Sequence, residues 1–315
     1  MLIETPRVFL SRSDYLTILS SPNLEHAAGH LSGSFLAAYV GKLVSTHELN
    51  LKNLLATLDK GYMDVIEQLL ENSGELRSRV EKVLWLLSSL DLYTTLNGLQ
   101  KGVEPPLLTS PLPDLMVRRL GDLSPRALAE RLPPEMQGMV SEYLKNKFVS
   151  PGQLVKAMGL LASSLSPLES YELGVLTGML HDLLLIKASK VITDLKQLQP
   201  KPLALSQSEL YSALDSEVED LPGIISRARP LAKMFAEILS DSLKLSKGVE
   251  ALDLAMYTGA SYLASLTLRG FGVEDYIRLL FKLLGQLVLL KLSFTIVHSG
   301  FYRQEATLLV GKWVV

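Results

Sequence analysis

The sequence predicts an all-α protein built from three similar helical units, and three observations lead to this prediction. Apolar residues recur at intervals of three and four along almost the whole chain, whereas the alternating pattern of a β-strand is short and rare. A pair of long helices can be recognised three times, each preceded by a block of shorter helices. The ten residues that open the first block nearly coincide with those that open the third.

These two decapeptides are LSRSDYLTIL at residues 10–19 and LSQSELYSAL at residues 205–214. In each, a serine directly precedes an acidic residue and an aromatic-aliphatic pair. The free N–H groups at a helix start favour a side-chain acceptor and negative charge. Both decapeptides therefore predict a helix start, and their recurrence indicates a stacked structural repeat rather than a single active site.

The first unit is expected over residues 1–108, with shorter helices in residues 10–42. Leucines and other apolar residues then recur at helical spacing from residue 49 until Asn-Ser-Gly at residues 72–74 supplies a stop. A second helix is predicted over residues 75–100, ending before a proline-rich join. The two long helices make an αα-hairpin.

The second unit is expected over residues 109–200, with shorter helices in residues 115–145. Ser-Pro pairs open two long helices, one over residues 150–165 and one that begins at residue 166 and fades near residue 195. The pairing of the first unit is thus repeated.

The third unit is expected over residues 201–315, with shorter helices in residues 205–243. Its long helices are predicted over residues 249–268 and 273–298. The intervening Gly270-Phe271-Gly272 lacks the third glycine and the preceding strand of a dinucleotide-binding loop, so it is interpreted as a helix break.

The last long helix is apolar enough to raise the question of a membrane span, and the mean hydropathy of the chain is +0.24. Arg278, Lys282 and Lys291 argue against a span, because a cation near the bilayer centre costs about 2.5–3.5 kcal/mol. A core helix with no transmembrane role is predicted. Arg278, Lys282 and Gln286 form one polar stripe on this helix, so they are the partner-binding candidates. An internal ion pair or the lining of a funnel would satisfy them.

Composition narrows the function classes. A net charge of −2, from 31 basic and 33 acidic residues, argues against nucleic-acid binding. The absence of cysteine excludes disulfides, thiolate metal sites and cysteine nucleophiles. Glu4 and Pro6 interrupt the start and argue against a cleaved signal peptide, so an intracellular location is expected.

Reactive motifs are few. His26 and His30 have a spacing able to clasp a metal, but the glutamate of a metalloprotease helix is absent, and an exposed helix end is the favoured interpretation. His181 and Asp182 are neighbours whose side chains should point apart on a helix. No catalytic residue, cofactor site or metal site is predicted. Two charged clusters are interpreted as solvated surface, one acidic and one basic: Asp215, Glu217, Glu219 and Asp220; and Arg118, Arg119, Arg126 and Arg131.

The opening of the chain resembles that of a known family. PRVFLSRSDY at residues 6–15, NLE at residues 23–25 and LSGS at residues 31–34 are similar to the start of the C subunit of archaeal-type and vacuolar-type rotary ATPases, which is named d in vacuolar enzymes. DLY at residues 91–93 and QKGVEP at residues 100–105 resemble the end of that family's helical pair. The chain departs from the pattern in two places, at Thr94-Thr95 and at Gly285-Gln286, where the family often carries an asparagine with a basic residue and a glutamate, respectively.

The resemblance implies three similar helical domains around a pseudo-threefold axis, in the shape of a funnel. It implies a non-catalytic central-stalk subunit, a socket between the rotor shaft and the membrane proteolipid ring of a complex that transports protons or sodium ions. Such a subunit lies at the cytoplasmic face of the membrane as a peripheral component, with no transmembrane span of its own.

Two alternatives remain open. A helical repeat scaffold unrelated to rotary ATPases would share the repeats without the threefold funnel. A helical enzyme would use buried carboxylates or a metal, although no paired E-x-x-H motif is present.

Overall fold

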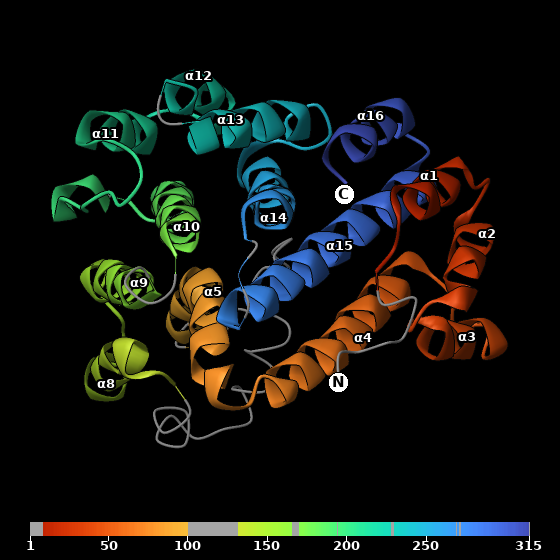
Figure 1. Cartoon of the computed structure of the whole chain (residues 1–315), viewed down its shortest axis with the longest axis horizontal. Coiled ribbons are helices and arrows are strands. Elements are labelled where there is room, and N and C mark those ends of the chain that lie inside the picture. Colours follow the sequence, from red (N-terminus) through yellow and green to blue (C-terminus); the bar gives the residue numbers. More distant parts are fainter. Residues whose placement is uncertain are drawn as a thin grey trace.

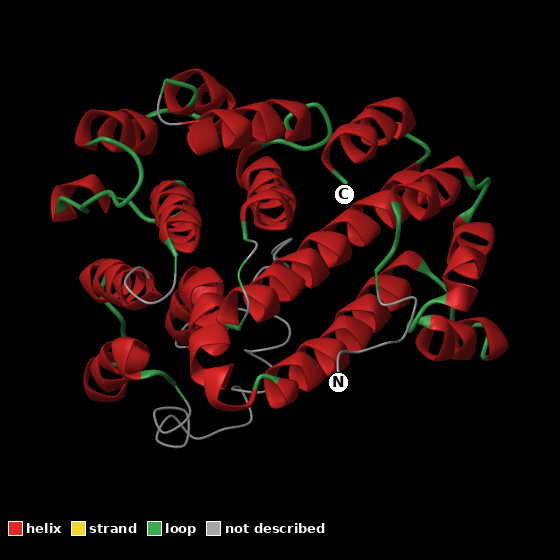
Figure 2. Cartoon of the chain, viewed as in Figure 1, coloured by secondary structure: helices red, strands yellow, loops and turns green. Residues whose placement is uncertain are grey.

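The chain is all-α within the residues that the computed structural model describes, which contain no strand (Figure 2). The described residues are 9–99, 132–165, 170–193, 195–227, 230–268, 270 and 272–314. The fold class expected from the apolar periodicity is therefore confirmed for this part of the chain.

Three pairs of long helices form the framework, and in each pair the two successive helices pack against each other (Figure 1). Their bounds agree closely with the expected hairpins. The pairs are α4 (Leu51–Asn72) with α5 (Arg77–Leu99), α9 (Pro151–Leu165) with α10 (Tyr171–Ser189), and α14 (Gly248–Thr267) with α15 (Val273–Ser299).

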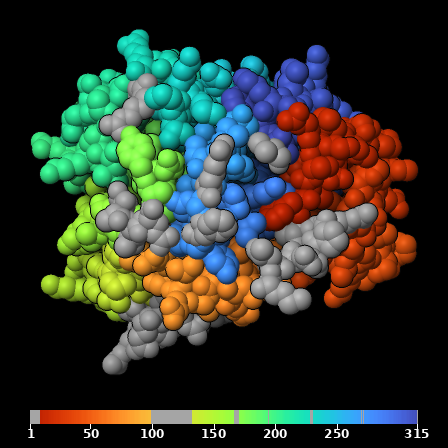
Figure 3. Space-filling view, in the orientation of Figure 1, coloured from red at the N-terminus to blue at the C-terminus, as the bar shows by residue number. Residues whose placement is uncertain are grey.

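Shorter helices precede each pair along the chain, as the sequence predicts. They are α1 (Arg12–Ser20), α2 (Leu24–Gly29) and α3 (Ala37–Ser45) before the first pair, α8 (Gln137–Asn146) before the second, and α11 (Gln207–Asp215), α12 (Leu221–Ile225) and α13 (Pro230–Ser242) before the third. Each helix pair, together with the shorter helices that precede it, makes up one stretch of the chain. In the space-filling view of Figure 3, these three stretches occupy different parts of the visible face.

Several sequence predictions lie outside the described residues. They include residues 115–131 of the second block, the boundary between residues 108 and 109, and the proline-rich join. The four arginines of the basic cluster and residues 6–8 and 100–105 of the family resemblance also lie there. The unit boundaries remain predictions.

The two similar decapeptides do start helices, and both starts are capping boxes. The Ser11 hydroxyl accepts a hydrogen bond from the Asp14 N–H, while the Asp14 carboxylate accepts from the Ser11 N–H at 2.7 Å. Ser206 and Glu209 repeat this arrangement at the start of α11. The capping serine thus lies three residues before the acid, and each box satisfies free N–H groups reciprocally.

The contacts between the helix pairs follow a cyclic order. Helix α5 of the first pair packs on α9 of the second, α10 of the second packs on α14 of the third, and α15 of the third packs on α4 of the first. At every junction the second helix of one pair meets the first helix of the next. Following these junctions along the chain leads back to the starting pair.

Helix α15 is a buried core helix, as predicted. Within the described residues it is the one helix long and apolar enough to cross a membrane, and 78% of its most apolar stretch is buried inside the protein. It packs against α14, α4, α5 and α1. Contact with these four helices is a sufficient physical reason for its apolar surface.

Two details at helix ends differ from expectation or refine it. Helix α10 ends at Ser189, and a short 3-10 helix, Leu195–Leu198, follows where the fading end was expected. The predicted break between α14 and α15 is present: Gly272 adopts φ +90°, and the Glu274 carboxylate accepts a hydrogen bond from the Gly270 N–H at 2.7 Å. Phe271 lies outside the described residues.

One described helix was not predicted. Helix α16 (Arg303–Trp313) follows α15 and packs on α1 and α13. Trp313 donates a hydrogen bond to Asp241 at 2.9 Å, and Arg12 donates to the Val314 carbonyl at 3.0 Å. The end of the described chain is thereby joined to its beginning.

Candidate functional site

The polar stripe on α15 begins at its exposed end with Arg278, whose side chain is 37% exposed. Its guanidinium donates to the Asp275 carboxylate at 2.5 Å and to the Leu268 carbonyl at 3.3 Å. Arg278 thus forms a local ion pair within the first turns of α15. An exposed pair of this kind contributes little to stability, about 0–1 kcal/mol, and leaves the guanidinium within reach of a partner.

Lys282, the second member of the stripe, is half-buried. Its ammonium lies 4.7 Å from the centre of the Phe9 ring, a cation–π contact. Desolvation by burial, and then repulsion from Arg278, lower the pKa of Lys282. Within the part of the chain that the structure describes, Lys282 forms no ion pair, so the internal ion pair expected for it is not seen, and the funnel lining stays a prediction.

Gln286, the third member, is buried and holds three segments together. Its side-chain carbonyl accepts from the Tyr62 hydroxyl at 3.1 Å, and its amide donates to the Leu10 carbonyl at 3.3 Å. The Tyr15 hydroxyl donates to its backbone carbonyl at 3.3 Å. Burial raises the pKa of both tyrosines. Gln286 therefore joins α1, α4 and α15 internally and is not presented to a partner.

The helix pairs meet around a buried ionic group that the sequence analysis did not identify. Lys187 of α10 lies 2.6 Å from the Asp253 carboxylate of α14, and their side chains are 2% and 1% exposed. Asp91 of α5 is also buried and attracts the same ammonium. Each of the three pairs thus contributes one charged residue.

The electrostatics of this group favour the charged lysine. Burial, the largest effect, lowers the pKa of Lys187, but attraction by Asp253 and Asp91 and the hydrogen bond to Asp253 together outweigh it, so the pKa is raised. Lys187 therefore stays an ammonium at neutral pH. It joins α10 to α14 by direct contact with Asp253 and to α5 by attraction to Asp91.

A second junction repeats the same order of charges. Lys291 of α15 forms an ion pair with Asp59 of α4, just as Lys187 of α10 pairs with Asp253 of α14. In both, the lysine belongs to the second helix of one pair and the aspartate to the first helix of the next. At the third junction, Asn97 of α5 instead donates to and accepts from the backbone of Val149, just before α9.

The expectation that the His181 and Asp182 side chains point apart is wrong. The His181 Nδ1 lies 2.8 Å from Asp182 Oδ1, and both side chains are buried. Asp182 also accepts hydrogen bonds from the N–H groups of the segment that follows α10: Leu203, Ala204 and Leu205. The Asp182 carboxylate thus anchors the segment through one oxygen and contacts the His181 ring through the other.

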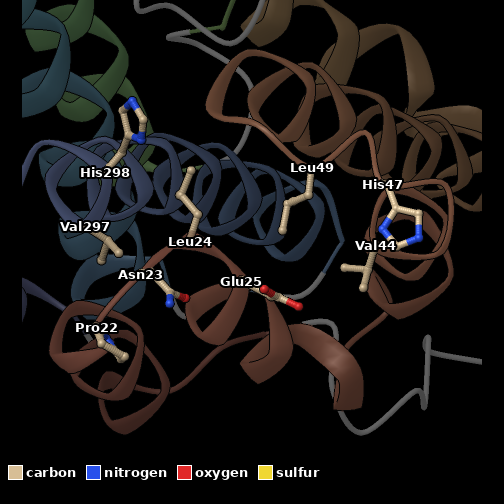
Figure 4. A pocket seen from close by; sticks show the side chains of 9 residues that line it. All are labelled: Pro22, Asn23, Leu24, Glu25, Val44, His47, Leu49, Val297 and His298. Carbon is tan, nitrogen blue, oxygen red and sulfur yellow. The ribbon is translucent and has the colours of Figure 1, made fainter.

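An open hollow of about 500 Å³ lies beside the N-terminal part of α2 and the C-terminal end of α15 (Figure 4). His47 and His298 stand at opposite ends of it, with Leu24 and Leu49 between them. The lining residues are Pro22, Asn23, Leu24, Glu25, Val44, His47, Leu49, Val297 and His298. The two imidazoles do not point toward each other in this view, and no group of three or more potential metal ligands occurs among the described residues.

The remaining candidate residues, two histidines and the acidic cluster, lie at or near the surface. His26 and His30 are both exposed, and no cluster of three or more potential metal ligands occurs among the described residues. The four residues of the acidic cluster lie at or near the surface, and Asp215 pairs with Lys196.

Comparison with known proteins gives no identification. No family model matches the chain, no curated protein matches it, and no solved structure matches its fold.

Proposed function

We propose that this chain is a non-catalytic central-stalk subunit of an archaeal-type or vacuolar-type rotary ATPase, seated between the rotor shaft and the membrane proteolipid ring at the cytoplasmic face. Its function is mechanical: it receives torque from one partner and passes it to the other during proton or sodium transport. It needs no cofactor and no transmembrane span of its own.

The cyclic order of the helix pairs is the observation that carries the proposal. The junctions α5–α9, α10–α14 and α15–α4 use equivalent helices in equivalent roles. The recurring capping boxes of α1 and α11 add a second repeated feature. Three repeated units with a closed order of contacts are what a pseudo-threefold socket requires.

The buried ionic contacts suit a body that transmits torque. Closely packed protein interiors have low compressibility. Removing one partner of a buried ion pair costs about 3–5 kcal/mol, so rearrangement at the Lys187–Asp253 contact is strongly opposed. The Lys291–Asp59 contact resists movement of α15 against α4 in the same way.

Affinity capture from native membranes tests the proposal. The chain is tagged, solubilised in mild detergent, captured and analysed by mass spectrometry. We expect shaft and proteolipid subunits in stoichiometric amounts. Their absence under conditions in which the remainder of the rotary complex stays intact would overturn the proposal.

A pair of matched variants tests the partner-binding role of the exposed end of the stripe. Arg278→Glu should weaken capture of the partners, whereas Arg227→Glu, at another exposed arginine, should not. Far-UV circular dichroism checks that both variants remain folded. Equal recovery of partners with the two variants would remove Arg278 from the interface.

A helical repeat scaffold unrelated to rotary ATPases is the second candidate. The ionic group of Lys187, Asp253 and Asp91 favours this candidate, because one buried charged side chain from each helix pair belongs to it. These side chains leave no open channel between the three pairs where they lie. A socket for the shaft would have to open on one side of this ionic group. Stoichiometric capture of a different set of proteins would support the scaffold.

A further inference from the structure

A small cavity of about 20 Å³ lies between α14 and α15, and residues of α1 and α16 also line it. From α14 it is lined by one helical face, residues 258, 261, 262 and 265, and from α15 by Lys282, Gln286 and Leu289. The other lining residues are Leu10, Tyr15, Trp313 and Val314. A space of this size holds one water-sized species.

One buried hydroxyl in the cavity wall lacks a partner. Thr258 is 1% exposed, and its hydroxyl has no hydrogen-bond partner within the described residues. Ser261, Tyr262 and Lys282 line the same cavity and are partly buried. A buried polar group without a partner costs about 1–3 kcal/mol, so the Thr258 hydroxyl indicates an occupant.

The cavity lining carries one cation and no negative charge. None of its lining residues is an aspartate or glutamate. The Gln286 side-chain carbonyl is engaged by Tyr62, and the Val314 carbonyl is engaged by the Arg12 guanidinium. The hydroxyl groups can donate or accept, so the Lys282 ammonium sets the sign of the charge that the lining favours.

Close helix packing fixes the dimensions of the site. A Cβ atom added to Gly285 would lie 2.5 Å from the Ser261 Cβ, so α14 and α15 approach closely beside the cavity. Tyr262 is held by an edge-on contact with Trp313, with ring centres 5.1 Å apart. The donors are thus placed by the framework and are not on a movable loop.

We propose that this cavity binds one small monovalent anion of the halide class, such as chloride, through the Lys282 ammonium and the Thr258, Ser261 and Tyr262 hydroxyls. Charge separates this occupant from a water molecule: an anion accepts from every donor and neutralises Lys282, whereas water leaves that charge uncompensated. Burial and then repulsion from Arg278 lower the pKa of Lys282, and a bound anion would offset both effects.

The bound anion would stabilise the docking of the N-terminal segment. Phe9 lies on the Lys282 ammonium, and Leu10 and Tyr15 contribute to the cavity wall. An anion on Lys282 fixes the ammonium under the Phe9 ring. Because the folded chain alone forms this site, binding stabilises it by mass action.

Bromide replacement gives the direct test. Crystals of the full chain soaked in sodium bromide should show an anomalous peak in hydrogen-bonding contact with the Lys282 Nζ and the Thr258 Oγ1. A cavity that holds only water, or that is empty, at bromide concentrations that label other sites would overturn the proposal.

Unfolding in solution gives a second test with matched variants. At equal ionic strength, urea unfolding should have a higher midpoint in chloride than in gluconate, which is too large for the cavity. At a chloride concentration ten times the Kd, the unfolding constant should fall about elevenfold. Lys282→Met and Thr258→Val should reduce or abolish the difference, whereas Lys156→Met, at an exposed lysine of α9, should preserve it. An undiminished difference in Lys282→Met would place the anion elsewhere and refute the site.

Discussion

Replacing Lys187 by methionine tests how much the buried ionic group contributes to the folded chain. The variant keeps the length and apolar stem of the side chain but removes the ammonium that lies 2.6 Å from Asp253 and is attracted by Asp91. Both carboxylates stay buried in the variant, because Asp253 and Asp91 lie in the interior of the original chain. Breaking a buried pair in this way lowers the free energy of unfolding by about 3–5 kcal/mol.

The two partners of the pair should not be equivalent. Asp253→Asn keeps a polar side chain, and the Lys187 ammonium still has Asp91, so the loss should be smaller than for Lys187→Met. The double variant Lys187→Met with Asp253→Leu should regain part of the loss, because one buried carboxylate is removed together with the cation.

The raised pKa of Lys187 predicts how the effect of the variant depends on pH. In the original chain the folded state holds the Lys187 proton more tightly than the unfolded state, in which the pKa is near 10.5. The contribution of the ammonium is therefore fully present below about pH 10 and is lost as pH rises through the folded-state pKa. The stability deficit of Lys187→Met should be full at about pH 7 and smaller at about pH 11.

Urea denaturation followed by circular dichroism at both pH values is the assay. Lys196→Met, which breaks an exposed Lys–Asp pair, is the matched control and should cost about 0–1 kcal/mol. Equal losses in Lys187→Met and Lys196→Met, or a deficit in Lys187→Met that is larger at the higher pH, would refute the reasoning.

Three further predictions follow from the packing. Ser11→Ala and Ser206→Ala should each lower the free energy of unfolding by about 1 kcal/mol through loss of a capping box, as measured by urea denaturation. If the losses in the two variants differ by much more than this, the two serines do not have equivalent roles. Gly285→Val should cost about 1–3 kcal/mol or more, measured by thermal unfolding, because its side chain would meet Ser261; an unchanged midpoint would show that the helices can separate freely. Gln286→Leu should cost about 1–3 kcal/mol and increase amide exchange in α1, because the Leu10 carbonyl and the Tyr62 hydroxyl lose their partner; protection of α1 equal to that of the original chain would contradict this.

The long helices could be predicted from the sequence because local signals specify them. Apolar spacing gave α9, α14 and α15 almost to the residue, and glycine or serine-proline signals marked their ends. The position of the capping serine was harder to predict, since several serines precede each acid and backbone geometry decides which one accepts the hydrogen bond. The local pattern therefore predicts that a helix is present more accurately than it predicts the residue at which the helix begins.

The apolar spacing of residues 306–313 indicates helix α16, although this helix was not predicted. Ala306, Leu309, Val310 and Trp313 recur at helical spacing and are buried. The helix follows Gly300 and carries exposed apolar residues such as Leu308 on its other face, which weakens the amphipathic contrast.

The site could be predicted only in part, because its partners are distant in sequence. Lys187 occurs in an apolar run, and nothing near it indicates that Asp253 and Asp91 meet it. The α15 stripe was visible from spacing, but its members have three different environments. The role of Gln286 depends on Tyr62 and Leu10, which only the packed fold brings to it.

Electron cryomicroscopy of the assembly captured with the tagged chain tests the central claim most directly. The account predicts density for this chain on the rotation axis, between the shaft and the proteolipid ring, with the α5–α9, α10–α14 and α15–α4 junctions arranged around that axis. A captured rotary complex that lacks this chain at that position, or a chain found only in an unrelated assembly, would contradict it.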